Sequence, residues 1–329
     1  MAAEGTVLVT GGAGYIGSHT VRALREAGRA VVVLDSLEFG RPDAVIDAPL
    51  VVGNIADQEL VTATCREYGV TQLMHFAAYK SVGESMENPT RYWRNNVARS
   101  IELIDACIDA GVSEMVLSSS CSVYGTPAQV PVTERAPIDP ESVYAETKAT
   151  LERLMTWYGV TKGLRSVSLR YFNAAGASFD GRLGEEWTFS LNLIPLAMKA
   201  VLLGDRRLQV FGDDYDTPDG TCIRDYIHVE DLAGAHHKSL EYLADGGGSA
   251  QVNVGTGTGS SVFEVIRATE RVAGQAVPYD VVDRRLGDPV ATYAAPEHAE
   301  QTLGWSARYG LDEIVRSAYE WHRSQVATS

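Results

Sequence analysis

The chain has 329 residues, 45% of them apolar and 22% charged, a composition that suits a globular protein with a full-sized core. Its net charge of -15 and isoelectric point near 4.9 imply an acidic surface, which makes nucleic acid and anionic membranes poor partners. The four cysteines lack paired or metal-ligand spacing, the N-terminus lacks a secretory pattern, and no apolar run reaches the roughly 20 residues of a membrane span, so we expect a cytoplasmic protein with no metal site.

The first elements predict a βαβ unit. A short β-branched strand at residues 6–10 leads into the glycine-rich segment 11–17, and a helical pattern then precedes a second apolar strand at residues 30–34. Such glycines let backbone amides at a helix N-terminus approach a pyrophosphate, and Asp35, which ends the second strand, is placed to take ribose hydroxyls. A tight turn without a ligand is the alternative. Because Ser36 rather than an arginine follows, we expect NAD and not NADP.

Strand and helix patterns continue to alternate up to about residue 175. Further strands are expected at residues 50–52, 72–76, 114–117 and 164–170, and long helices at about 88–110 and 142–158. Repeated strand–helix units imply an α/β protein with a doubly wound parallel sheet, a Rossmann fold, with helices on both faces. Ligands of such a sheet lie beyond the carboxyl ends of its strands, where Phe76, the serines 118–120 and Tyr171 are expected to converge.

After about residue 175 the segments become less regular, and glycine and acidic turns such as residues 211–220 become frequent. We therefore predict a cofactor-binding domain of residues 1–175 and a smaller α/β substrate domain of residues 176–329. The helix near residues 229–243 is expected to pack back onto the first domain.

The predicted chemistry depends on two residues of one helix. Tyr144 and Lys148 lie four positions apart in a run free of glycine and proline, so they share one helix face. A nearby ammonium lowers the pKa of a phenol from about 10 by roughly 1–3 units, which would let Tyr144 act as a general base near neutral pH. A hydroxyl from the serines 118–120 would relay the proton or hold a substrate oxygen. Such pairs also occur by chance, so the interpretation needs support from other motifs.

That support comes from motifs spread over nearly the whole chain, at residues 11–17, 75–85, 92–97, 118–125, 144–148, 169–173, 210–215, 218–229, 253–257 and 284–288. In this order they closely resemble the UDP-glucose (UDP-galactose) 4-epimerases, which are extended short-chain dehydrogenases/reductases. The resemblance implies an isomerase that uses NAD: Tyr144 takes the proton of the sugar 4-hydroxyl while C4 passes a hydride to NAD. The 4-keto sugar then turns over and takes the hydride back on its other face.

The resemblance also implies the residues of the site. The catalytic residues would be Ser120, Tyr144 and Lys148. Cofactor-binding residues would be Gly11, Gly14, Tyr15, Ile16, Gly17, Asp35, Ser36, Asn54, Ile55, Phe76, Ala77, Ala78, Lys80, Asn96, Ser118, Tyr144, Lys148 and Tyr171. The UDP-sugar would be bound by Lys80, Ser120, Tyr144, Asn173, Asn192, Leu193, Val210, Phe211, Arg224, Tyr226, Arg285, Asp288 and Thr292. The arginines among them suit a pyrophosphate, because each offers a fork of donors.

The family also forms dimer contacts through helices such as those expected at residues 88–110 and 142–158, so a homodimer is expected. The chain departs from the family pattern at residues 143–148, which keep Tyr144 and Lys148, at residues 191–193, which lose one amide near the sugar, and at two single positions. Asn54 replaces the usual aspartate at the adenine contact, although an amide oxygen can still accept from the adenine amine. Thr292 stands where relatives carry a bulky tyrosine or a small cysteine, and we expect it to leave room for an N-acetyl group on the sugar.

Four alternatives to UDP-glucose 4-epimerisation follow. The same reaction on UDP-glucuronate or on UDP-N-acetylglucosamine would use the same motifs. A 4,6-dehydratase would carry an Asp-Glu pair where this chain has Cys121 and Ser122, neither of which can do the proton work at C5 and C6. A non-catalytic NAD sensor typically loses the tyrosine or the lysine, and this chain keeps both.

Overall fold

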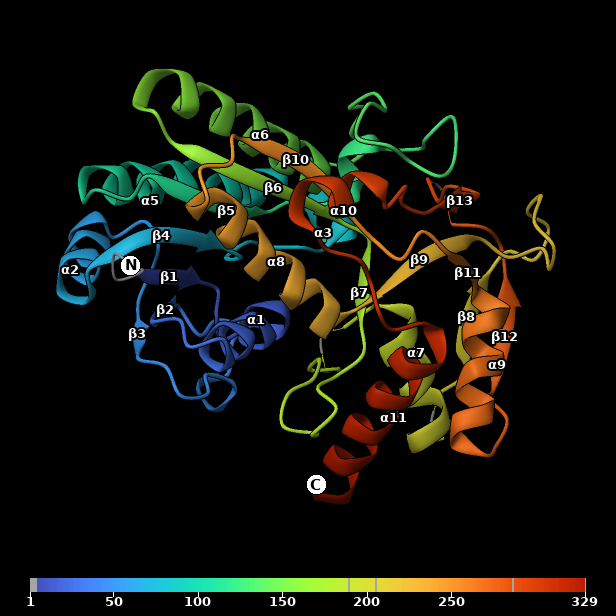
Figure 1. Ribbon diagram of the computed structural model, residues 1–329. Coiled ribbons are helices and arrows are strands. Elements are labelled where there is room, and N and C mark those ends of the chain that lie inside the picture. Colours follow the sequence, from blue (N-terminus) through green and yellow to red (C-terminus); the bar gives the residue numbers. More distant parts are fainter. Residues whose placement is uncertain (1–4, 189, 205, 286, 329) are drawn as a thin grey trace.

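The computed structural model describes residues 5–188, 190–204, 206–285 and 287–328, and a seven-stranded parallel sheet forms its centre (Figure 1). Leu286 of the motif at residues 284–288 and the N-terminal residues 1–4 lie outside the described residues. The strands of the sheet are β1 (Thr6–Thr10), β2 (Val31–Asp35), β3 (Leu50–Val52), β4 (Val70–His75), β5 (Glu114–Ser118), β6 (Arg165–Tyr171) and β10 (Ala250–Val254). Their order is β10-β6-β5-β4-β1-β2-β3, which confirms the predicted doubly wound Rossmann fold.

Helices cover both faces of this sheet. They are α1 (Tyr15–Glu26), α2 (Gln58–Tyr68), α5 (Arg99–Asp109), α6 (Val143–Lys162), α8 (Val229–Ala244) and α10 (Glu297–Leu303). Two short helices, α3 (Val82–Glu87) and α4 (Pro89–Tyr92), pack against α6. Side chains alternate across β1: Val7 and Val9 pack with α1 and α8 on one face, and Leu8 packs with α2, α5 and α6 on the other. Both faces are thus buried, which explains why β2 is an unbroken apolar run up to Asp35.

The helix expected at residues 88–110 is interrupted. After α4 the chain forms a π-helical segment, Trp93–Ala98, before α5 begins at Arg99. The wider turn directs Asn96 into the interior, where it is fully buried. A π segment inserts a residue into an otherwise ordinary helical pattern, so periodicity does not reveal it, although such segments are frequent at functional sites.

The rest of the chain forms two smaller sheets with their own helices, seen on the right side of Figure 1. The elements are β7 (Asn173–Ala175), β8 (Leu208–Phe211), β9 (Ile223–His228), β11 (Gly259–Ser261), β12 (Tyr279–Val282), β13 (Ala291–Thr292), α7 (Leu193–Leu203), α9 (Val262–Ala273) and α11 (Leu311–Thr328). In the part of the chain that the structure describes, no helix combines the length and the apolarity needed to cross a membrane.

Three later elements return to the central sheet. Leu232 and Leu243 of α8 share an apolar cluster with Val21 and Leu24 of α1, and Leu303 of α10 joins the same cluster. Strand β10 adds to the sheet edge beside β6, which the sequence pattern did not predict. Residues on both sides of the expected boundary near residue 175 thus build the central sheet and its helices.

The glycine-rich segment follows β1 at the point where the strand order reverses between β1 and β4. Gly11 has a φ of +74°, and a Cβ on it would lie 2.6 Å from the backbone nitrogen of Ala77, which follows β4. A Cβ on Gly17 would lie 2.2 Å from the carbonyl oxygen of Gly11. These glycines are required because a side chain at either position would collide with neighbouring backbone atoms. The tight turn they permit directs the first turn of α1 toward the carboxyl edge of the sheet.

Gly17→Ala is expected to lower the free energy of unfolding by about 1–3 kcal/mol, because the added methyl meets a backbone oxygen that cannot move aside. Gly83→Ala is the matched control, since Gly83 lies in helix α3 and an added Cβ there meets nothing within 4 Å. Alanine should stabilise that helix by up to about 1 kcal/mol. Urea unfolding of both variants measures the difference, and equal midpoints would contradict this account of the glycine turn.

Candidate active site

Ser120, Tyr144 and Lys148 lie together at the carboxyl end of β5. The Lys148 Nζ donates a hydrogen bond to the carbonyl oxygen of Ser118 at 2.7 Å and lies 5.9 Å from the centre of the Tyr144 ring. The Ser120 hydroxyl lies close enough to Tyr144 to lower the pKa of its phenol. Its oxygen accepts from the amide and the hydroxyl of Ser122, at 3.2 and 2.9 Å, so the Ser120 proton is left for donation.

Local structure explains the convergence. Helix α6 begins at Val143 because the Ser142 hydroxyl caps it, accepting from the Ala145 amide at 3.2 Å. Tyr144 therefore lies in the first turn, and Lys148 one turn further on the same buried face. Ser118 is the last residue of β5, so its carbonyl group is available to the lysine.

Burial dominates the electrostatics of the pair. It raises the pKa of Tyr144 well above that of an ordinary phenol, and the neighbouring Tyr171 adds to the rise, while the hydrogen bond with Ser120 lowers it. Burial also lowers the pKa of Lys148 to about 8, against the field of Glu152. The prediction that Lys148 brings the Tyr144 pKa toward neutrality is therefore wrong for these side chains alone, because the burial that joins them disfavours both charges.

A buried polar network behind the serines was missed by the sequence analysis. The Glu152 carboxylate pairs with Arg170 and accepts from the Ser119 hydroxyl at 2.5 Å. Ser118 donates from its hydroxyl to that of Tyr171 at 3.0 Å. One signal was present in the sequence: Glu152 stands four residues after Lys148, on the same helix face.

The glycine-rich segment fits the pyrophosphate of a dinucleotide. Gly14 is the N-cap of α1 and offers no side chain to the amides of the first turn, which contains no acidic residue. Asp35 is buried, and its two oxygens accept from the backbone amides of Ala13 at 3.0 Å and Leu37 at 2.8 Å. The carboxylate thus shapes the loop, and its remaining lone pairs are those that ribose hydroxyls need.

Other expected cofactor residues divide into packing and lining positions. Ile55 is buried in the cluster beneath the sheet, and Ile16 packs against the opposite cluster. Tyr15 donates from its hydroxyl to the carbonyl oxygen of Gly176 at 2.7 Å, which joins α1 to the loop after β7. Exposed or half-buried positions at the carboxyl edge are Ser36, Asn54, Phe76, Ala77 and Ala78.

Asn96 and Lys80 differ from the expected cofactor contacts. The Asn96 side chain is fully buried, and it binds both backbone groups of Tyr79 at 2.9 Å, so it positions the loop that carries Lys80. The Lys80 ammonium lies 3.4 Å from the Glu185 carboxylate, which also accepts from the Asn192 amide at 2.9 Å. Glu185 thus joins a residue expected at the cofactor to one expected at the sugar.

A second group of predicted residues gathers around Asp288. Its carboxylate lies 3.6 Å from Arg224 and accepts from the guanidinium of Arg285 at 3.0 Å. The Arg285 guanidinium also lies 5.1 Å from the centre of the Phe211 ring. Two arginines around one aspartate leave an excess of positive charge beside an aromatic face, an arrangement that suits a pyrophosphate and a base.

The other residues expected to bind the UDP-sugar divide into buried and exposed positions. Val210 is buried in an apolar cluster, so its side chain cannot line a site, and strand alternation places Gln209 rather than Val210 on the exposed side with Phe211. Leu193 and Tyr226 likewise pack into apolar clusters. The exposed Asn173 donates to the carbonyl oxygen of Asp225 at 3.0 Å.

Thr292 lies directly opposite Arg224, in register between β13 and β9. Its side chain is buried, and its hydroxyl has no hydrogen-bond partner within the described residues. A buried hydroxyl without a partner is unfavourable in the protein alone, so this position suits a polar ligand group.

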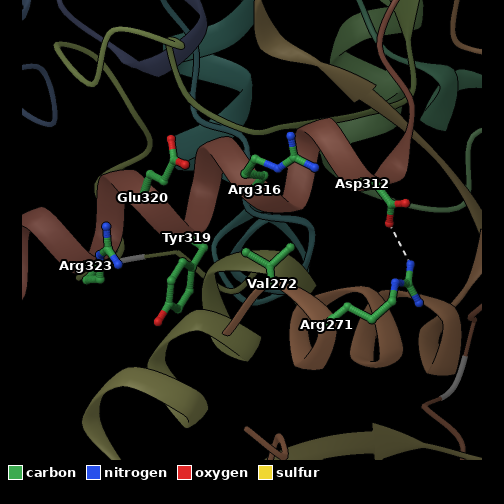
Figure 2. A pocket seen from close by; sticks show the side chains of 7 residues that line it. All are labelled: Arg271, Val272, Asp312, Arg316, Tyr319, Glu320 and Arg323. Atoms are coloured by element: carbon green, nitrogen blue, oxygen red, sulfur yellow. Dashed lines mark hydrogen bonds and ion pairs between the residues drawn. The ribbon is translucent and has the colours of Figure 1, made fainter. Parts of the chain in front are cut away.

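A separate pocket of about 500 Å³ lies between α9 and α11 (Figure 2). None of its lining residues is among those predicted for the site, and its Arg271 already pairs with Asp312 at 2.6 Å. We do not assign the reaction to it. Within the described ranges, no three His, Cys, Asp or Glu side chains are grouped as a metal ion would require.

Comparison with known proteins gives consistent matches over nearly the full length. Residues 7–255 match the family described as "NAD dependent epimerase/dehydratase family". The UDP-glucose 4-epimerase of Azospirillum brasilense is 48% identical over 98% of this chain and 93% of its own. The solved UDP-glucose 4-epimerase of Brucella ovis in complex with NAD superposes with a TM-score of 0.95 at 45% identity, covering 97% of this chain and 99% of that one.

A third relative was solved with a nucleotide sugar. It is the UDP-glucose-4-epimerase from Stenotrophomonas maltophila with bound NAD and formylated UDP-arabinopyranose. The TM-score is 0.96 at 39% identity, and the match covers 99% of this chain and 100% of that one.

Proposed function

We infer the reaction from the family to which this chain belongs, the NAD dependent epimerase/dehydratase family. The protein is an isomerase that interconverts the 4-epimers UDP-glucose and UDP-galactose and uses NAD as its cofactor. Of the features in this chain, the convergence of Ser120, Tyr144 and Lys148 at the carboxyl end of β5 carries the assignment.

Each of these residues has a role in moving one proton. Bound NAD supplies an acceptor for the hydride of C4 and returns it. The Tyr144 oxygen accepts the proton of the sugar 4-hydroxyl and later gives it back. The Ser120 hydroxyl donates a hydrogen bond to the sugar oxygen or to Tyr144 and keeps its proton, and Lys148 contributes the positive charge that offsets the buried phenolate.

Arg224 and Arg285 are proposed to hold the pyrophosphate, with Phe211 against the uracil. Asn192 and Lys80, joined by Glu185, are placed to bridge the sugar and the cofactor. We also propose the division into a cofactor domain of residues 1–175 and a nucleotide-sugar domain of residues 176–329, with α8 packing on the first.

A cytoplasmic location is proposed on the four unpaired cysteines. There the enzyme would serve galactose metabolism. Recovery of the protein from a secreted fraction would contradict this location.

The purified protein, assayed with and without added NAD, is expected to bring UDP-glucose to equilibrium with its 4-epimer. Tyr144→Phe should lower the turnover by about 10²–10⁴-fold, because the proton acceptor is lost. Tyr158→Phe is the matched control, since Tyr158 lies on the same helix and its hydroxyl binds Asp105 at 2.7 Å, outside the site. Chromatography of the nucleotide sugars measures both variants. Full activity in Tyr144→Phe would overturn the base assignment, and turnover of UDP-glucuronate alone would overturn the substrate.

We further propose that Thr292 admits an N-acetyl group, because the side chain is small and its buried hydroxyl lacks a partner within the described residues. Thr292→Tyr is expected to lower turnover of UDP-N-acetylglucosamine about tenfold or more, since the larger side chain fills the space, while UDP-glucose turnover changes little. Thr292→Cys, which stays small, should keep both activities. Equal rates on UDP-N-acetylglucosamine in the wild type and in Thr292→Tyr would discard the proposal.

A homodimer is proposed to form through α6, where two large apolar side chains are exposed on one face. Trp157 is 65% exposed and Val160 73% exposed, far more than a folded monomer normally leaves for adjacent side chains of this size. Trp157→Glu combined with Val160→Glu should therefore give a monomer in sedimentation velocity. Leu203→Glu, at an exposed apolar position on α7, is the control and should leave the dimer intact. A wild-type monomer at micromolar concentration would rule the dimer out.

A further inference from the structure

We infer that Glu152 is a positioning residue of this site: its buried carboxylate fixes the serine segment that follows β5 and supports the charge of Lys148. The inference rests on the proposed function, because it concerns how the groups that move the proton are held. It does not require Glu152 to touch the sugar or the cofactor.

The spacing along α6 places Glu152 on the same helix face as Tyr144 and Lys148. Tyr144, Lys148 and Glu152 stand at intervals of four residues, so they follow one another along one face of the helix. Their exposed fractions are 7%, 3% and 5%, and a carboxylate so deeply buried needs partners for both oxygens.

Those partners come from two other parts of the chain. One carboxylate oxygen accepts from the Ser119 hydroxyl at 2.5 Å and from the Arg170 Nε at 3.0 Å. The other accepts from the Arg170 Nη2 at 2.5 Å. The Arg170 guanidinium continues to the Tyr124 hydroxyl at 2.8 Å, and that hydroxyl donates to Asn253 at 2.7 Å. The network is therefore satisfied at each step, and it joins α6, β6 and β10 behind the serines.

The serine segment is held at each of its residues. The Ser118 carbonyl accepts from Lys148, and the Ser119 amide donates to the carbonyl oxygen of Leu169 at 2.9 Å. The Ser119 hydroxyl donates to Glu152. Because adjacent residues are linked, anchoring Ser119 fixes where the Ser120 hydroxyl meets Tyr144.

The charged and titratable groups around Lys148 give Glu152 a second effect. Tyr144 and Glu152 face it from α6 and His75 faces it from β4. From β6, Tyr171 binds the hydroxyl of Ser118, whose carbonyl group holds the lysine, and Arg170 pairs with Glu152. His75 is neutral because burial lowers its pKa to about 3, and burial raises the pKa of Tyr171, which is neutral as well. The carboxylate is thus the group whose field favours the ammonium against desolvation.

The test is the pH profile of UDP-galactose turnover with NAD present. Glu152→Gln keeps the shape and accepts from Ser119 but removes the charge, so Lys148 should lose its proton at lower pH. We expect the alkaline limb of the kcat/KM profile to shift to lower pH by about one unit. The decrease in kcat/KM relative to wild type should then be about tenfold greater at pH 9 than at pH 6.5. KM should change little, because the arginines around Asp288 are untouched. Glu152→Asp, which keeps the charge, should restore the wild-type limb.

Asp231→Asn is the matched control. Asp231 is also a buried carboxylate paired with an arginine, Arg308 at 3.2 Å, but it lies outside the site. It should lower stability and leave the pH profile unchanged. If Glu152→Gln does not fold because Arg170 is left unpaired, Glu152→Gln combined with Arg170→Gln should move the limb down by a smaller amount, because the positive charge that opposes the carboxylate is removed with it.

The proposed function and the role of Glu152 are contradicted by different results. A wild type that turns over no UDP-sugar would defeat the proposed function. An active wild type with an unmoved limb in the folded Glu152→Gln protein, or in the double variant, would defeat the role of Glu152 alone. A limb that also moves in Asp231→Asn would show that lost stability, and not position, shifts the profile, and would likewise defeat it.

Discussion

The site depends on one buried positive charge. Lys148 is 3% exposed, and its ammonium is held against the carbonyl oxygen of Ser118, the last residue of β5. A strand end is one of the few places in a buried sheet where a carbonyl group is free to accept from a side chain. Helix α6 must therefore cross the sheet where that strand ends, and this placement brings Tyr144 to the same edge. The fold around the lysine is set by the need to satisfy an ammonium away from water.

Charge also governs the other half of the site, where Arg224 and Asp288 are mostly buried and the Arg285 side chain is largely exposed. The protein carries a net charge of -15, which opposes the approach of an anionic nucleotide sugar. Arg224 and Arg285 provide a local exception, and Asp288 between them holds both guanidinium groups in place before a ligand arrives. An aspartate there weakens the attraction, yet it reduces the side-chain entropy lost on binding. At the proposed site, selectivity for a pyrophosphate would thus come from a small prearranged group and not from the overall field.

The fold and the convergence of the main residues followed from local patterns. Glycines that meet backbone, β-branched runs and the spacing of Tyr144 and Lys148 are properties of short segments, and parallel strands bring their carboxyl ends to one edge whatever the loops do. Contacts set by tertiary structure did not follow. Asn96 turned inward because of a π segment, Val210 faced the core because of strand register, and Glu152 met Arg170 from a strand 18 positions later. Each depends on a partner that no local pattern identifies.

The direction in which the Tyr144 pKa shifts shows how burial changes a charge argument made from sequence. An ammonium nearby favours a phenolate, but removing both groups from water disfavours each charge, and in this protein desolvation is the larger effect. The resting protein therefore keeps the proton on Tyr144. A phenol in this state becomes acidic only when further positive charge is placed beside it. Tyr144 would then release its proton most readily next to oxidised NAD, whose ring is positively charged, and hold it next to the neutral reduced form. Under the proposed mechanism, deprotonation of Tyr144 would thus accompany binding of the oxidised cofactor, whereas a tyrosine that is acidic in the free protein would lack this dependence.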